Sequence, residues 1–187
     1  MDGMNISRPR SSTTQLELFD REQFIPTQYP DGSVNHGRIR TAVGEFFETL
    51  TAEILGAVRH VIDSRCEYCP DLSLGQTYLE VKAVGRSRQM FVYAGRLAKD
   101  RELFKRHPLC YVIWSHSLDT QLVTNVAQLK TQLRKSINCH YYVPFEFLFE
   151  TFRPLVPVRL NSRYGAGRLY GSGYRLSLTK LAEFQQL

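Results

Sequence analysis

Residues 70–84 constrain the fold most strongly, because their pattern predicts both a local structure and its register. Gly75-Gln76 separates two stretches in which apolar and polar residues alternate. A short turn signal between two alternating stretches predicts a β-hairpin with a two-residue loop. In the register that follows, Asp71 on the first strand lies opposite Glu80 on the second.

The same register assigns each side chain of the hairpin to one face of the sheet, because successive side chains point to opposite faces. The polar face carries Asp71, Ser73, Tyr78, Glu80 and Lys82, and the apolar face carries Leu72, Leu74, Leu79, Val81 and Ala83. Like charges directly across a sheet are destabilising, with Cβ atoms roughly 4.5–5.5 Å apart. A divalent cation held by Asp71 and Glu80 would compensate, and Mg²⁺ prefers one or two carboxylates with water. Two acids, a metal and the ammonium group of Lys82 are suited to phosphodiester hydrolysis. The alternative is an ion-paired polar surface.

Pro70-Asp71, eight intervening residues and Glu80-Val81-Lys82 resemble the signature of the PD-(D/E)XK nuclease superfamily, which includes restriction endonucleases, Holliday-junction resolvases and repair nucleases. The resemblance covers residues 40–115. It implies an α/β fold with a restriction-endonuclease-like core, a mixed central sheet flanked by helices in the order helix, three strands, helix, strand. It also implies a deoxyribonuclease that uses Mg²⁺, with Mn²⁺ as a substitute, in which Asp71 and Glu80 bind metal and Lys82 positions water.

The helix expected to open this core spans residues 38–63, where apolar residues recur at helical spacing. Its expected core stripe is Val43, Phe47, Leu50, Ile54, Val58 and Val61. In the superfamily a glutamate of the first helix often completes the metal site, commonly as Gly-x-x-x-Glu, and Gly44-x-x-x-Glu48 matches this form. We therefore prefer Glu48 to Glu45 as the third acid, although both could be solvated helix charges.

The chain after the hairpin contains further predicted elements and several candidate DNA contacts. The elements are a helix over residues 91–106, beginning as late as Ala94, a buried strand over 109–114, a helix over 125–137 and a final helix capped by Ser177 or Thr179. The candidate DNA-binding residues are Arg86, Arg88, Arg163, Arg168 and Tyr170, which lie in basic connections and in an aromatic, glycine-rich extension. Arginine forks suit phosphates and aromatic rings suit base stacking. A solvated turn and an ordinary hairpin are the alternatives.

The N-terminal region differs from the rest in composition, and it predicts a flexible tail over residues 1–37 followed by a single nuclease domain over 38–187. Gln15-Leu-Glu-Leu-Phe19 resembles the pentapeptide that binds the bacterial sliding clamp, whose usual form is Gln-Leu-Ser/Asp-Leu-Phe. The resemblance implies that Gln15, Leu18 and Phe19 anchor the tail on the clamp. Glu17 departs from the usual middle residue, and a segment folded back on the domain is the alternative.

The composition and the cysteines indicate the kind of partner and the cellular compartment. The chain of 187 residues has a formal net charge of +6, which suits a polyanionic partner. Neither a secretory signal nor an apolar run of the roughly 18 residues needed for a membrane span is recognisable, so we expect a cytoplasmic protein without a membrane partner. Cys66-x-x-Cys69 raises the question of zinc, but Cys110, Cys139 and His140 do not form a clean second ligand pair, and buried thiols are the preferred interpretation.

Taken together, the sequence predicts a Mg²⁺-dependent DNA endonuclease of restriction, phage or repair and recombination type. Duplex cleavage and junction resolution commonly use two active sites, so a homodimer is expected. A catalytically inactive nuclease-like module that binds DNA and acts with replication or repair proteins is the competing hypothesis. A ribonuclease or RNA-binding domain is a weaker one.

Overall fold

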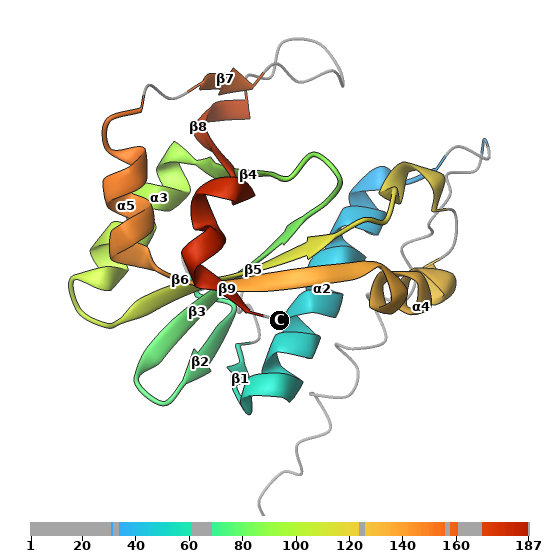
Figure 1. Cartoon of the computed structure of the whole chain (residues 1–187), viewed down its shortest axis with the longest axis horizontal. Helices are drawn as coiled ribbons and strands as arrows, with labels where there is room; N and C mark the ends of the chain where they lie inside the picture. Colours follow the sequence, from blue (N-terminus) through green and yellow to red (C-terminus); the bar gives the residue numbers. More distant parts are fainter. Residues whose placement is uncertain are drawn as a thin grey trace, which may run out of the picture.

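A mixed β-sheet forms the centre of the computed structural model, which describes residues 31, 34–60, 69–123, 126–155, 158–160 and 170–186 (Figure 1). Within these residues the sheet has six strands in the order β1-β2-β3-β5-β6-β9. These are β1 Val58–Arg59, β2 Leu72–Leu74, β3 Thr77–Val84, β5 Leu109–His116, β6 Ile137–Pro144 and β9 Gln185–Gln186. A second, three-stranded sheet has the order β4-β8-β7, formed by β4 Gln89–Tyr93, β8 Tyr170–Ser177 and β7 Val158–Leu160.

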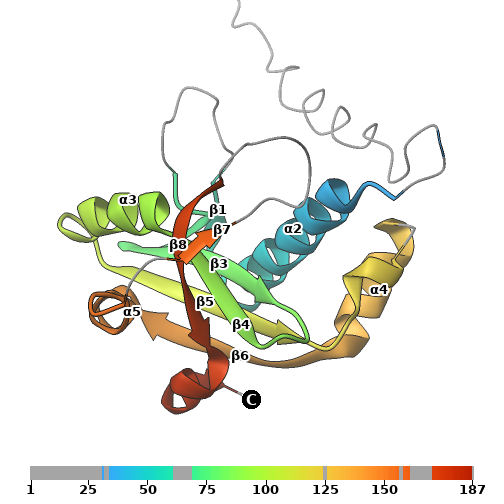
Figure 2. The same ribbon diagram turned by 90° about the horizontal axis from the view of Figure 1, so that it is seen from above.

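Helices cover both faces of the central sheet, which confirms the predicted α/β class with a mixed sheet flanked by helices. They are α2 His36–Leu55, α3 Ala94–Phe104, α4 Val126–Ser136 and α5 Phe145–Phe152, with short 3₁₀ helices η2 Thr120–Leu122 and η3 Leu178–Phe184. Figure 2 shows α2 and α4 on one side of the molecule and α3 and α5 on the other. None of the helices in the described part of the chain has the length and apolar character to cross a membrane.

The predicted hairpin is present with the predicted register. β2 and β3 are antiparallel and pair Leu72 with Leu79 and Leu74 with Thr77, and Gly75 has the positive φ of 59° that a tight turn requires. Of the predicted apolar face, Leu72, Leu79 and Val81 are buried. Leu74 and Ala83 are exposed, which corrects the expectation that the whole face packs on the core.

The strand β5 separates two hydrophobic cores because its side chains alternate between two covered faces. Tyr111 and Ile113 belong to the core beneath α3 and α5, whereas Val112 and Trp114 belong to the core beneath α2 and α4. β5 runs parallel to β3 and antiparallel to β6. The continuous apolar run predicted this double burial, and the strand extends the predicted one to His116.

Helix α2 is shorter than the predicted helix over residues 38–63. Asn35 caps its N-terminus by accepting a hydrogen bond from the Arg38 amide at 3.1 Å. Gly56 ends it in the left-handed conformation, with φ of 65°, which glycine adopts at little cost. Residues after Gly56 therefore leave the helix, and Val58, predicted for the core stripe, lies in β1 and is exposed.

The buried face of α2 also differs from the predicted stripe. Ile54 is 57% exposed, whereas the buried residues are Ile39, Ala42, Val43, Phe46, Phe47 and Thr51. The predicted stripe assumed a longer helix, so it was centred too far toward the C-terminus.

The predicted helix over residues 91–106 begins at Ala94, its latest predicted start, because residues 89–93 form β4 instead. Met90 and Val92 are buried, whereas Tyr93 is 46% exposed, which is the alternation of a strand. β4 pairs antiparallel with β8, at the other end of the sequence. The predicted helix over 125–137 corresponds to α4, and Ser177 caps η3 as predicted, its side chain accepting from the Thr179 amide at 3.4 Å.

Candidate active site

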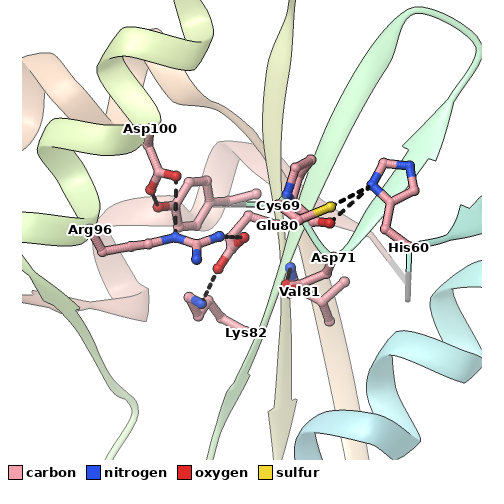
Figure 3. Close-up of polar contacts among 10 residues, drawn as sticks. His60, Cys69, Asp71, Glu80, Val81, Lys82, Arg96 and Asp100 are labelled. Atoms are coloured by element: carbon pink, nitrogen blue, oxygen red, sulfur yellow. Dashed lines mark hydrogen bonds and ion pairs between the residues drawn. The ribbon is translucent and has the colours of Figure 1, made fainter. Parts of the chain in front are cut away.

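The hairpin brings Glu80 and Lys82 together on the side of the sheet that faces α3, and Asp71 lies next to them beside Val81 (Figure 3). Glu80 and Lys82 lie on β3, and Asp71 directly precedes β2. The β2–β3 ladder ends at Leu72 and Leu79. Continuing the register places Asp71 opposite Glu80 as predicted, one residue beyond the ladder.

The end of this ladder gives Asp71 its position. Pro70 would lie opposite Val81 in the continued register, but proline has no N–H to donate to the Val81 carbonyl, so this pair cannot form both ladder bonds. The Val81 amide donates to Asp71 Oδ2 at 2.7 Å. The backbone oxygen of Asp71 accepts from the His60 amide at 3.0 Å, which ties the residue to the segment after β1.

Asp71 lies in an environment that disfavours its charged form. Burial raises its pKa from 3.8 to about 7, and the negative charges of Glu80 and Glu48 add to this effect. Lys82 and the Val81 amide lower the pKa but do not restore the ordinary value. A carboxyl group whose pKa is raised by neighbouring acids would be stabilised in its charged form by a bound cation.

Glu80 is buried but fully engaged by two cationic side chains. Only 2% of its side chain is exposed, and it forms ion pairs with Lys82 through Oε1 and with Arg96 of α3 through Oε2. The predicted ammonium beside the acids is therefore present. The Arg96 contact was not predicted.

Arg96 also contacts Asp100, one turn further along α3. Arg96 Nε lies 3.3 Å from Asp100 Oδ1. Asp100 is completely buried and accepts a hydrogen bond from the Tyr111 hydroxyl of β5. The sequence signal available for this pair was the spacing of four residues, which places Arg96 and Asp100 next to each other on a helix surface.

The third predicted acid, Glu48, approaches the site from α2 on the other side. Its charge raises the pKa of Asp71, and its Oε2 forms an ion pair with Arg59 of β1 at 2.7 Å. Glu45 is paired with Arg38 at 3.5 Å. Glu48 is thus near enough to influence Asp71 electrostatically, but its ion pair is with Arg59 on the edge strand β1.

The donor set fits a divalent cation that prefers oxygen ligands. In the ranges that the structure describes, His, Cys, Asp and Glu side chains do not converge in groups of three or more. Mg²⁺ does not require such a cage, since it commonly binds one or two carboxylates, water and substrate phosphate. Asp71 and Glu80 supply two carboxylates, and burial together with the charge of Glu80 raises the pKa of Asp71 to about 7.

The predicted DNA-binding residues are only partly described. Arg86 is on the surface, where its side chain is 65% exposed, donates to the Ser117 carbonyl at 2.8 Å and lies 3.5 Å from Asp119. Arg88 has a positive φ of 50° and a side-chain hydrogen bond to Tyr141. Arg163 and Arg168 lie outside the described residues, as do Gln15, Leu18 and Phe19 of the clamp-binding peptide, and Tyr170 is described only as the first residue of β8.

Of the two cysteines that suggested zinc, Cys66 lies outside the described residues and Cys69 is described. Cys69 Sγ lies 3.4 Å from His60 Nδ1, and His60 Nε2 lies 2.9 Å from Ser73 Oγ. His60 was not among the predicted zinc ligands. These contacts hold the segment that leads into Asp71 against β1 and β2.

Comparisons of the chain with protein-family models, curated proteins and solved structures give no significant match.

Proposed function

We propose that this protein is a Mg²⁺-dependent DNA endonuclease. The observation that carries the proposal is the position of Asp71 at the end of β2, beside the buried Glu80, where its pKa is raised to about 7. A bound divalent cation would stabilise the charged form of Asp71 in this position. Lys82, on the same strand as Glu80, adds the positive group that phosphodiester hydrolysis uses.

Asp71 and Glu80 would hold the metal, with Glu48 in support, and Mn²⁺ would substitute for Mg²⁺. When bound, the cation supplies Lewis acidity to the phosphodiester. Lys82 donates one of its three ammonium hydrogens to Glu80, which leaves two for water or a phosphate oxygen. With 29% of its side chain exposed, Lys82 can reach an incoming substrate.

The order of elements around these residues supports the same proposal. Helix α2 is followed by strands β1, β2, β3 and β4, and then by helix α3 and strand β5. Without β4, which belongs to the second sheet, this order matches the helix, three strands, helix and strand that the resemblance to the PD-(D/E)XK superfamily implies. Many α/β proteins share this order of elements, so the proposal depends mainly on Asp71 and Glu80.

The substrate that we propose is DNA, because the chain carries a formal net charge of +6 and Arg86 and Arg88 are exposed near the hairpin. Arg163, Arg168 and Tyr170 would extend this contact. Restriction, phage and repair roles all use such chemistry. A homodimer would supply two active sites, and the clamp-binding peptide would link cleavage to replication.

A second candidate function is a nuclease-like module that binds DNA without cutting it. Both carboxylate oxygens of Glu80 already accept from cationic side chains, Lys82 and Arg96. A metal must therefore compete with Arg96 or share Glu80 with it. If the ion pairs of Glu80 with Lys82 and Arg96 persist in the presence of metal, the site is an internal charge network and the protein acts through binding alone.

Cleavage of supercoiled plasmid distinguishes the two functions. Wild-type protein, Glu80→Gln and Glu102→Gln would each be incubated with Mg²⁺ and with EDTA. Glu102 is the matched control, because it is an exposed glutamate on α3 that pairs with Lys105. We expect cleavage by wild type and Glu102→Gln with Mg²⁺ alone, and none by Glu80→Gln. Duplex and branched DNA bound equally by all three proteins, without cleavage of either, would favour the binding module.

A further inference from the structure

Arg96 links the proposed metal site to a buried anchor. Its Nη2 donates to Glu80 Oε2, whereas its Nε lies 3.3 Å from Asp100 Oδ1. Asp100 is completely buried and is fixed by the Tyr111 hydroxyl. Figure 3 shows the guanidinium of Arg96 between the two carboxylates. The Asp100 contact can therefore persist when the Glu80 contact changes.

The formal charges of this cluster show what a bound metal would change. Glu80 and Asp100 contribute −2, and Lys82 and Arg96 contribute +2. Asp71 makes the total −1 when it is ionised. A divalent cation on Asp71 and Glu80 changes the total from −1 to +1, so the cluster then carries one positive charge too many. Repulsion from the metal acts on both cations that share Glu80 with it, and Arg96 is the one that has a second carboxylate, Asp100, to pair with when it leaves Glu80.

We propose that Arg96 is a phosphate clamp that metal binding releases. In the metal-free protein it neutralises Glu80. When a divalent cation binds, Arg96 leaves Glu80, remains held by Asp100, and donates to a phosphate oxygen of the nucleic acid. This inference rests on the proposed function and names Arg96 as a substrate contact, with Asp100 and Tyr111 as positioning residues.

The chemistry of arginine suits this exchange. A guanidinium has five donors in a fixed, planar fork, so it can keep one carboxylate on one edge while it binds a phosphate through another. The Arg96 side chain is 28% exposed, which gives it access to a substrate at the site. Lys82 stays on Glu80 through the other carboxylate oxygen and does not need to move.

The first test is metal affinity, because it does not depend on cleavage. Mn²⁺ binding to the full chain would be titrated by electron paramagnetic resonance for wild type, Arg96→Gln and Lys105→Gln. The last variant is a matched control, since Lys105 pairs with Glu102 at the far end of α3 and its loss removes the same charge. We expect Arg96→Gln to bind Mn²⁺ roughly tenfold more tightly, since a competing charge-assisted bond is gone, and Lys105→Gln to match wild type.

The second test is the coupling between metal and nucleic acid. The affinity for a duplex oligonucleotide with phosphorothioate linkages, which resist cleavage, would be measured with and without Mn²⁺. In wild type we expect Mn²⁺ to strengthen binding. Arg96→Lys keeps the positive charge but removes the planar guanidinium, and Asp100→Asn weakens the contact that holds Arg96. Both variants should therefore reduce the Mn²⁺-dependent increase in oligonucleotide affinity at least about fivefold.

The outcomes separate the clamp from the nuclease proposal. Mn²⁺ binding that is unchanged in Asp71→Asn and in Glu80→Gln would overturn both the clamp and the nuclease proposal. Dependent binding, with Arg96→Gln folded and binding Mn²⁺ no more tightly than wild type, would overturn the clamp alone. If Arg96→Gln does not fold, Arg96→Lys decides, and an unchanged coupling in that variant would overturn the clamp.

Discussion

At Asp71, a hydrogen bond that favours the charged carboxylate opposes an environment that disfavours it. The carboxylate is fixed by the Val81 amide at 2.7 Å, which favours its charged form, but burial and the charges of Glu80 and Glu48 oppose ionisation more strongly. Residues that keep such a conflict commonly belong to functional sites, where a ligand resolves it. A cation that binds Asp71 would do so here.

This conflict predicts an unusual dependence of stability on pH. Because the pKa of Asp71 is raised from 3.8 to about 7, the folded protein holds a proton between these values that the unfolded chain has lost. The contribution of Asp71 to the free energy of unfolding therefore falls as pH rises from 4 to 7. In EDTA, Asp71→Asn should gain stability relative to wild type across this range, as measured by urea unfolding at each pH.

Adding Mg²⁺ at pH 8 should restore stability to wild type and not to Asp71→Asn, because binding to the native state alone stabilises it. Asp119→Asn is a suitable control, since Asp119 is a surface residue beside Arg86. A stability difference between Asp71→Asn and wild type that is constant from pH 4 to pH 8 would contradict the assignment of the raised pKa.

At the scale of elements, turns and chain ends decide where the site residues lie. Gly56 ends α2 and allows β1 to begin two residues later, so that β1 can pair with β2 and hold the segment leading to Asp71. Pro70 ends the ladder between β2 and β3. The position of the candidate site depends on these local signals.

A pair of glycine substitutions in α2 tests the first signal. Gly56→Ala places a Cβ at φ of 65°, which costs about 1–2 kcal/mol. Gly44→Ala, in the same helix, meets nothing within 4 Å of the added Cβ and should stabilise by about 0.5–1 kcal/mol. Thermal unfolding of the two variants should therefore shift in opposite directions, and a shift of both in one direction would contradict this account of the helix end.

The sequence predicted the elements whose partners are close along the chain. The turn at Gly75 predicts the register of β2 and β3 without reference to the rest of the protein. β4 was missed because its partner, β8, lies about eighty residues away, and its alternation covers only five residues. Arg96 was not predicted as a site residue for a similar reason, because only the fold brings it to Glu80.

The contact between β4 and β8 depends on Gly173. A Cβ at this position would lie 2.6 Å from the Val92 carbonyl oxygen and would also meet the ring of Phe91. Gly173→Ala should destabilise the protein by about 1–3 kcal/mol, since backbone atoms cannot move aside easily. Gly95→Ala in α3, where the added Cβ meets nothing within 4 Å, is the control, and urea unfolding of both variants provides the measurement. Equal stability of the two would contradict the close approach of the strands.

For the whole molecule, the two cores place the site on one side of the sheet. The core beneath α2 and α4 supports the apolar face of the hairpin, and the opposite face carries Glu80 and Lys82 and meets α3. The proposed clamp-binding peptide lies in the sequence before all of these elements. Its function is therefore expected to be separable from that of the site.

This separation can be tested with a substitution in the peptide. Replacing both Leu18 and Phe19 by alanine removes the apolar anchors that the clamp would bind. We expect binding to a bacterial sliding clamp to be lost in calorimetry, with the thermal unfolding midpoint and Mg²⁺-dependent plasmid cleavage unchanged. Loss of thermal stability in this variant would instead show that the segment packs on the fold.

The net charge of +6 predicts that DNA affinity falls steeply with salt, because each neutralised phosphate releases counterions. If Arg86 contacts a phosphate, Arg86→Gln should weaken binding uniformly across sequences. It should also reduce the slope of log affinity against log salt by about 1. Arg153→Gln is the matched control, since Arg153 is an exposed arginine at the end of α5 that pairs with Glu150 at 3.5 Å. Fluorescence anisotropy with a labelled duplex from about 50 to 200 mM salt covers the range where such slopes are measured. An equal slope for Arg86→Gln and wild type would show that Arg86 serves the Ser117 and Asp119 contacts and not the DNA.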